Sequence, residues 1–411
     1  MPEDRSDEET SDQESEEEEE ESDAPELKKS RNKALLEFRF RVEQAILGNY
    51  LLSNKSKKNT PNENEILKDI KLWGVTLLPK EGHEGTNTVL MKFLKSKRYK
   101  VHEAFVLLRK TLKWRADFRP DELGEDLRPE TDNLWFSNGR DKEGRPLCYN
   151  VLGKESHKKP FISGDQKYQK YLRWRVLCVE RGIQNLNFRP GEADSIIQII
   201  DLKNAPGQAM KEVKLICKKM INLLHDHYPG VVYKNLIINV PSWFLALNAL
   251  NLRLITQRSK NKFIFVKPSR VTETLLEYAT IENILVQYGG LKRENDAEFS
   301  TDDKVLEANI RASTTEYIQI PVNEAGVTVT WDVTVVGYEV TYKEEFIPDD
   351  DCSYKILLQE KKMKETTRNT FHIREPGKIV ITIVNGSYTK KKAFYRYKSR
   401  PTVPMYMLMK S

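Results

Sequence analysis

The stretch between residues 194 and 291 most constrains the fold, because three short apolar runs alternate there with two segments of helix length. The apolar runs cover 195–200, 235–240 and 262–266 and are rich in β-branched and aromatic residues. Such runs, separated by helical crossovers, are typical of a buried parallel sheet with right-handed connections. We therefore expect an α/β unit in the middle of the chain.

The length of 411 residues exceeds the usual size of one domain, so we expect further folded units on both sides. Apolar residues at helical spacing predict helices at 34–52, 66–73, 87–94, 101–114 and 166–186, and turn residues at 139–144 predict a hairpin. The expected parts are an acidic disordered tail (1–26), an amphipathic helix and linker (27–63), a helical subdomain (64–125), the α/β unit (130–293), an all-β unit (303–400) and a C-terminal tail (401–411).

The all-β unit is predicted from alternating apolar residues. Val327, Val329, Trp331, Val333 and Val335 alternate with polar residues, and Ile379, Ile381 and Ile383 repeat the pattern further along. Several short strands separated by turn residues, with no segment of helix length, indicate a β-sandwich.

Charge is distributed very unevenly along the chain. Residues 1–26 hold 15 Asp/Glu and one Arg, so the remaining residues carry a net charge of +20 although the whole chain carries only +6. A block of like charges repels itself and stays disordered, whereas a basic body suits an anionic membrane or a nucleic acid. No aromatic and basic RNA-binding signature is present, so we expect no nucleic-acid partner. The alternative is a solubilising tail with scattered surface cations.

No reaction machinery is recognisable. Nucleophile-elbow, phosphate-loop, dinucleotide and zinc-protease motifs are missing from the sequence, so we expect no enzyme, no catalytic residue, no cofactor and no metal. His225 and His227 are two residues apart and do not share a helix face, so we expect them to pack at a helix end, where a positively charged imidazole is favoured. Four widely separated cysteines and the absence of a signal or membrane-spanning stretch indicate a cytoplasmic protein.

The crossover at 242–258 is apolar nearly all round. A helix of this kind must be buried in a core or must face lipid.

Residues 66–293 resemble the CRAL-TRIO lipid-binding family. The matching segments are 90–99, Trp114-Arg115, Asp201-Leu202-Lys203, Tyr228-Pro229, 237–241 and 286–290. The C-terminal part is similar to a GOLD domain through 331–336 and Glu375-Pro376-Gly377. An acidic tail, a CRAL-TRIO unit and a GOLD sandwich in this order resemble the patellins.

This resemblance implies a carrier that holds a phospholipid, related to the phosphoinositides, in an apolar pocket gated by the segment 242–258. The expected pocket and gate residues are Trp243, Phe244, Leu247, Leu250 and Leu254. Carried over to this sequence, Lys97, Arg98, Ser259 and Lys262 would contact the headgroup phosphate. The alternative is that these cations are ordinary surface residues. The sequence departs from the family pattern at Gly230, where an acidic residue usually follows Tyr-Pro, and at Ile196 and Gln198, where relatives carry small hydroxyl residues for a choline lipid.

Basic residues gather near the C-terminus, where residues 361–411 carry a net charge of +11. We expect an anionic membrane surface to bind Lys390, Lys391, Lys392, Arg396 and Lys398, so that the protein associates peripherally with membranes in trafficking. The alternative role for these lysines is to protect an edge strand from aggregation. A second functional hypothesis is an adaptor whose GOLD domain recruits trafficking proteins without lipid transfer.

Overall fold

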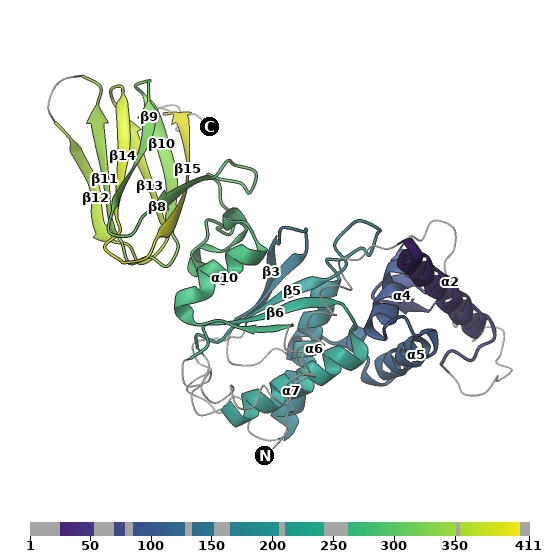
Figure 1. Cartoon of the computed structure of the whole chain (residues 1–411). Coiled ribbons are helices and arrows are strands. Elements are labelled where there is room, and N and C mark those ends of the chain that lie inside the picture. The colour runs from purple at the N-terminus through teal and green to yellow at the C-terminus, as the bar shows by residue number, and fades with distance from the viewer. Residues whose placement is uncertain are drawn as a thin grey trace, which may run out of the picture. The chain divides into compact units, whose positions relative to one another are not determined.

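The computed structural model describes residues 25–52, 70–78, 85–127, 134–151, 165–204, 210–241, 262–350 and 354–402 (Figure 1). The chain divides into two compact units, and each is considered by itself. The first contains residues 1–131, 156–196 and 206–233, and the second contains residues 132–155, 197–205 and 234–411.

Long helices dominate the described part of the first unit. They are α2 (Pro25–Leu47), α4 (Gly85–Ser96), α5 (Val101–Phe118), α6 (Asp165–Ile183) and α7 (Met210–His227). The helices predicted at 87–94, 101–114 and 166–186 are confirmed as α4, α5 and α6. Helix α2 begins well before the predicted start at residue 34, because the polar residues that precede its apolar stripe are good helix formers.

The prediction of a helix at 66–73 is wrong for its last residues, and residues 66–69 lie outside the described residues. Strands β1 (Lys71–Leu72) and β2 (Val75–Thr76) pair across a two-residue turn. Trp73 and Gly74 occupy this turn with φ angles of +53° and +80°, as a type I′ hairpin requires. The Trp73 ring stacks on Phe93 and Phe188, with centroids 5.9 Å apart in each case, so packing holds the strained turn.

The second unit contains a five-stranded sheet in the order β3-β4-β5-β6-β7. Its strands are β3 (Leu134–Arg140), β4 (Pro146–Val151), β5 (Ile196–Asp201), β6 (Val232–Ile238) and β7 (Phe263–Phe265). The three strands expected from the apolar runs are β5, β6 and β7. Pairing is parallel between β4 and β5 and between β6 and β7, and the predicted hairpin adds β3 antiparallel to β4.

One face of this sheet is closed by the chain that follows it. Helix α10 (Val271–Tyr278) and the turn before residue 291 pack on this face. The buried cluster contains Leu147, Tyr149, Ile197, Ile199, Leu236, Ile238, Val271, Leu275 and Tyr288. Asp201 accepts hydrogen bonds from Tyr288 Oη at 3.0 Å and Asn239 Nδ2 at 2.7 Å, which ties the closing turn to the strand ends.

The C-terminal part of the second unit is a sandwich of two four-stranded antiparallel sheets, as predicted. Its strands are β8 (Leu306–Ile310), β9 (Thr315–Val322), β10 (Val327–Val335), β11 (Thr341–Pro348), β12 (Ile356–Lys362), β13 (Thr367–Ile373), β14 (Gly377–Val384) and β15 (Lys391–Pro401). The sheets have the orders β13-β10-β15-β8 and β12-β11-β14-β9. The alternating apolar residues of β10 and β14 form the core between them.

A carboxylate lies inside this sandwich. Glu344 is fully buried and accepts hydrogen bonds from Trp331 Nε1 at 2.9 Å, Tyr342 Oη at 2.6 Å and Asn369 Nδ2 at 2.6 Å. The three donors come from β10, β11 and β13, so the acid connects the two sheets.

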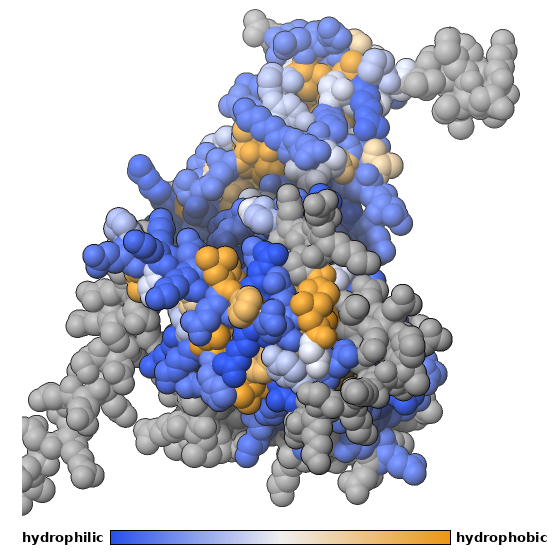
Figure 2. Space-filling view, turned by 90° about the vertical axis from the view of Figure 1, so that its right-hand side faces the viewer, coloured by the Kyte–Doolittle hydropathy of each residue, from blue (hydrophilic) through white to orange (hydrophobic). Residues whose placement is uncertain are grey.

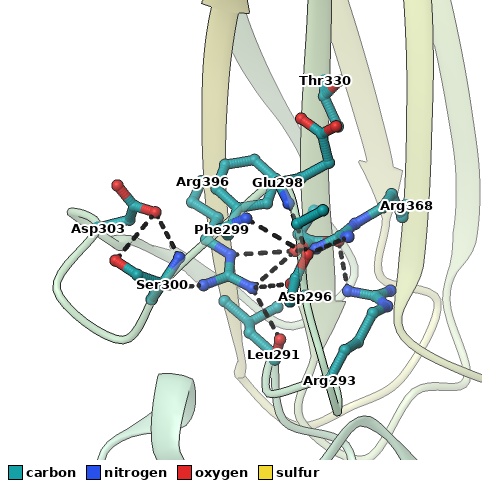
Figure 3. Close-up of polar contacts among 12 residues, drawn as sticks. Leu291, Arg293, Asp296, Glu298, Phe299, Ser300, Asp303, Thr330, Arg368 and Arg396 are labelled. Atoms are coloured by element: carbon teal, nitrogen blue, oxygen red, sulfur yellow. Dashed lines mark hydrogen bonds and ion pairs between the residues drawn. The ribbon is translucent and has the colours of Figure 1, made fainter.

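An ion cluster covers the outer face of the β13-β10-β15-β8 sheet (Figure 3). Asp332 on β10 is fully buried and lies opposite Arg368 on β13 and Arg396 on β15. Its oxygens accept from Arg368 Nε at 2.8 Å, Arg396 Nε at 3.0 Å and Arg293 Nη1 at 2.7 Å. Arg293 lies in residues 292–305, which lead into β8 and which we call the connecting segment, so the cluster joins this segment to the sheet.

A second acid of the connecting segment reinforces this cluster. Both guanidinium Nη atoms of Arg368 donate to Asp296 at 2.7 Å. Burial alone would raise the pKa of Asp296, but Arg368 and the backbone N–H groups of Glu298 and Phe299 hold it below its ordinary value. The Phe299 ring lies 4.4 Å from the Arg396 guanidinium, in a cation–π contact.

We predict that Asp332→Ala destabilises the protein by about 3–5 kcal/mol, because it leaves three arginines without their shared buried carboxylate. Urea unfolding of the full chain measures this loss. The matched control is Asp303→Ala, which removes the ion-pair partner of Lys398. Because Asp303 is more exposed than Asp332, this loss should cost at most about 1 kcal/mol. Equal losses in the two variants would contradict a central role for Asp332.

Candidate functional site

The face of the five-stranded sheet opposite the α10 cluster carries a buried amide on each of three neighbouring strands. Asn150 on β4, Gln198 on β5 and Asn235 on β6 are 7%, 1% and 2% exposed. In the parallel pair, Gln198 is opposite Cys148 and Ile200 is opposite Asn150, so Asn150 and Gln198 point to the same side. We call this side of the sheet the amide face.

Two donors on the amide face are unsatisfied. Asn150 Nδ2 and Gln198 Nε2 are buried and have no hydrogen-bond partner among the residues that the structure describes. An unpaired buried donor costs about 1–3 kcal/mol, so such groups call for an acceptor such as a ligand oxygen or a water molecule.

Most of the other side chains of the amide face are apolar. Ile237 is buried, and Phe263 and Phe265 on β7 are half-buried on the same side. A mostly apolar wall with a few placed polar groups is the usual composition of a small-molecule site. The amide face can therefore donate two hydrogen bonds to an acceptor on an otherwise apolar ligand.

In the first unit, Gly230 replaces the expected acidic residue and supplies an acceptor through its backbone. Lys92 is 6% exposed, and its Nζ lies 2.9 Å from both the Gly230 carbonyl oxygen and Asp194 Oδ2. Gly230 has a φ angle of +66°, which disfavours residues with a side chain. The carboxylate of Asp194 thus neutralises the buried Lys92, and the carbonyl of Gly230 accepts one of its hydrogen bonds.

The Trp-Arg and Tyr-Pro motifs meet at a buried acid. Arg115 Nη1 and Nη2 donate to the two oxygens of Glu180 at 2.6 and 3.2 Å, and Tyr228 donates to the same carboxylate. Burial and the neighbouring Glu180 raise the pKa of Tyr228 well above its ordinary value. Because these residues come from α5, α6 and the end of α7, the motifs connect the helices of the first unit.

His227 at the end of α7 is neutral, so the predicted positive imidazole is wrong for this residue. Its ring stacks on Trp114 with centroids 4.3 Å apart and an angle of 8° between the planes. Burial lowers the pKa of His227 to about 4, and the nearby Asp226 only partly opposes this. The cost of burying a charge therefore exceeds the attraction of the helix end.

The four predicted headgroup residues lie in different units of the chain or outside the described residues. Lys97 and Arg98 lie in the turn after α4, in the first unit, where Lys97 is half-buried and Arg98 is exposed. Lys262 lies directly before β7 in the second unit. Ser259 lies outside the described residues. The predicted gate residues Trp243, Phe244, Leu247, Leu250 and Leu254 also lie outside them.

The five predicted docking residues occupy different environments. Lys390 and Lys392 are exposed and Lys391 is half-buried, around the start of β15. Lys398 pairs with Asp303 at 2.7 Å. Arg396 is 2% exposed and belongs to the Asp332 cluster, so we exclude it from the docking set.

Sequence reasoning missed two features of the second unit. Tyr388 is 96% exposed and precedes the three lysines in the same loop. The amide face was missed because apolar content identified its strands, although polar residues inside buried strands at positions 150, 198 and 235 were a usable signal.

The described residues contain no helix that is long and apolar enough to cross a bilayer. Within the same part of the chain, no group of three or more His, Cys, Asp or Glu side chains is placed to hold a metal ion. Cys148 and Cys178 are buried free thiols.

Comparison with protein families gives two matches. A family model described as the CRAL/TRIO domain matches residues 130–290. A model described as the Patellin-1-like C-terminal GOLD domain matches residues 311–392.

Curated relatives resemble most of the chain. It is 43% identical to Patellin-4 of Arabidopsis thaliana over 343 residues, which cover 82% of this chain and 63% of Patellin-4. It is 36% identical to Patellin-3 of the same plant over 389 residues, covering 92% of this chain and 76% of Patellin-3. Phosphatidylinositol transfer protein SFH5 of Kluyveromyces lactis is 26% identical over 211 residues, covering 50% and 68%. The chain thus spans less than two thirds of the length of Patellin-4.

We predict that His227 makes the first unit less stable in acid. Its folded pKa of about 4 lies below the ordinary value near 6.5, so the unfolded chain takes up the proton first. The contribution to stability is complete above about pH 6.5 and is lost as the pH falls toward 4.

Thermal unfolding between pH 7 and 4.5 should therefore show a shallower acid decline for His227→Phe than for the wild type. His225→Phe, which changes an imidazole that is 67% exposed, is the control and should keep the wild-type slope. A wild-type slope in both variants would contradict the neutral His227.

Proposed function

The chain belongs to the patellin family, and from this premise we propose that it binds one phospholipid in its CRAL-TRIO unit and transfers it between membranes. The observation that supports this proposal best is the amide face, where buried apolar side chains surround the two unsatisfied donors of Asn150 and Gln198. A phospholipid offers both chemistries that such a face needs, since its acyl chains are apolar and its ester and phosphate oxygens accept hydrogen bonds.

The energetics of lipid transfer require an enclosed site. Each acyl CH₂ group exposed to water costs about 0.8 kcal/mol, so two long chains cost on the order of 20 kcal/mol. In our proposal the apolar segment 242–258 gates the site, through the predicted residues Trp243, Phe244, Leu247, Leu250 and Leu254. Such a gate opens at a membrane, where its own apolar surface can be buried.

For the headgroup, we propose a phosphoinositide-related lipid. One relative, SFH5, is named a phosphatidylinositol transfer protein. Lys97, Arg98, Ser259 and Lys262 are the candidate phosphate ligands, because cations and a hydroxyl group suit phosphate oxygens.

For membrane docking, we propose the loop that leads into β15. Tyr388 is 96% exposed, and Lys390, Lys391 and Lys392 follow it directly. Each cation near an anionic leaflet contributes about 1 kcal/mol at low salt, and an exposed tyrosine suits the headgroup region. Lys392 and Lys398 are weaker candidates, because Glu307 and Asp303 already pair with them, each at 2.7 Å.

The second candidate function is a trafficking adaptor that recruits proteins through the GOLD sandwich without moving lipid. Exposed apolar side chains on the sandwich favour it, notably Tyr317 at 61% and Leu357 at 55% exposure. Transfer of labelled phospholipid between vesicles separates the two functions, since only the carrier performs it.

We predict that Asn150→Leu with Gln198→Leu lowers phospholipid transfer and lipid occupancy about tenfold, because two donors to the ligand are lost. Native mass spectrometry measures occupancy, and vesicle transfer measures the rate. Stability should be unchanged or higher, because the substitutions remove unsatisfied buried donors.

The matched control is Thr367→Val, which removes another unsatisfied buried hydroxyl, in the sandwich. It should leave transfer unchanged. If the double variant holds as much lipid as the wild type, lipid binding at the amide face is contradicted. If the wild type itself holds no lipid and transfers none, the carrier function is contradicted.

We predict that replacing Lys390, Lys391 and Lys392 by Ala weakens binding to phosphoinositide-containing vesicles at least about tenfold at low salt, and less at high salt. Co-sedimentation measures the binding. The control replaces Lys361, Lys362 and Lys364 and removes the same charge elsewhere on the sandwich. Equal weakening in both variants would indicate net charge instead of a specific docking loop.

A further inference from the structure

Helix α2 has two apolar stripes, and among the described residues only one of them is buried. Phe38, Val42, Ala45 and Ile46 follow helical spacing and are at most 1% exposed. This stripe faces the neighbouring helices α4 and α5 of the first unit. Burial of these four residues holds α2 against α4 and α5.

The second stripe faces outward. Leu36, Phe40 and Leu47 are 68%, 62% and 54% exposed, and their separations of four and seven residues place them on the same side of the helix. Figure 2 views the side of the molecule on which α2 lies in Figure 1 and shows separate apolar islands among hydrophilic residues there. A large exposed phenylalanine with two leucines on one face is unusual for a helix that has finished its packing.

Basic residues extend the outward stripe toward the N-terminus of α2. Lys29 and Lys33 are exposed and lie on the same side as Leu36, Phe40 and Leu47. The acid within this side, Glu43, pairs with Arg39 at 2.8 Å. The whole helix contains six Lys/Arg and three Glu, so its net charge is +3.

We propose that this outward face of α2 docks on an anionic membrane, with Leu36, Phe40 and Leu47 inserted below the headgroups. An apolar stripe beside lysines is the pattern by which a helix lies in a membrane interface, because the lysine stems stay in contact with the apolar region while their ammonium groups reach lipid phosphates. The lysines give the face charge complementarity to such a surface. This contact goes beyond lipid carriage and uses residues far in sequence from the docking loop of the sandwich.

The test compares full-length variants in flotation with vesicles of phosphatidylcholine alone and of phosphatidylcholine with phosphatidylserine. The variant Leu36→Gln, Phe40→Gln and Leu47→Gln keeps good helix formers on α2 and leaves its buried stripe intact. We expect its partition onto the anionic vesicles to fall at least about tenfold, with wild-type circular dichroism and thermal unfolding. The control, Val106→Gln with Tyr317→Gln, changes side chains of similar exposure elsewhere and should bind like the wild type.

A second measurement reports contact directly. In a Phe40→Trp variant, lipids brominated on their acyl chains should quench more tryptophan fluorescence than in the wild type. Wild-type partition of the triple Gln variant, or absence of extra quenching, overturns the proposal. Sedimentation tests the alternative occupant, a second copy of the chain. If the wild type is a dimer, the triple Gln variant is a monomer and vesicle binding is unchanged, then the face serves self-association and the membrane proposal is overturned.

The loop variant at Lys390, Lys391 and Lys392 separates this inference from the proposed function. Loss of vesicle binding in the loop variant alone overturns α2 docking and leaves the carrier function standing. Loss in the triple Gln variant while lipid occupancy stays at the wild-type level supports α2 docking independently of the cargo.

Discussion

The buried Asp332 is the constraint on which the second unit depends. It lies between Arg368 and Arg396 on the two adjacent strands, so the register of β13, β10 and β15 must be right for the charges to be neutralised. Arg293 and Asp296 complete the cluster from the connecting segment. A carboxylate surrounded by arginines in this way contributes specificity of arrangement more than net stability, because its desolvation offsets much of the attraction.

The two faces of the five-stranded sheet differ in the side chains that they carry. The chain itself closes one face through α10 and the Tyr288–Asp201 hydrogen bond, and the side chains buried there are mostly apolar, with the Tyr149 hydroxyl left without a partner among the described residues. The other carries the donors of Asn150 and Gln198, which the described residues do not satisfy. Since natural cores rarely leave such donors unpaired, two neighbouring amides with unpaired N–H groups mark the amide face as the side with capacity for a ligand.

Much of the architecture follows from periodicity in the sequence. The apolar runs predict β5, β6 and β7, and the alternation around Trp331 predicts the sandwich, because burial selects these patterns directly. The turn at Trp73-Gly74 is not predicted by periodicity, because its backbone conformation and aromatic packing override the helical pattern of the sequence. For the candidate site, charge alone predicts the docking residues and wrongly includes Arg396, because sequence alone does not distinguish a solvated cation from one neutralised by a distant acid.

The connecting segment packs on the sandwich, although none of its residues belongs to a strand. Phe299 is 4% exposed beneath the cations, and the Arg396 guanidinium donates to the Ser300 carbonyl oxygen at 3.1 Å. A fragment that starts at β8 would lack this segment and would therefore expose Arg368, Arg396 and Lys398, which the intact chain pairs with Asp296, the Ser300 carbonyl oxygen and Asp303. Affinity for polyanions measured on such a fragment would be an artefact of truncation.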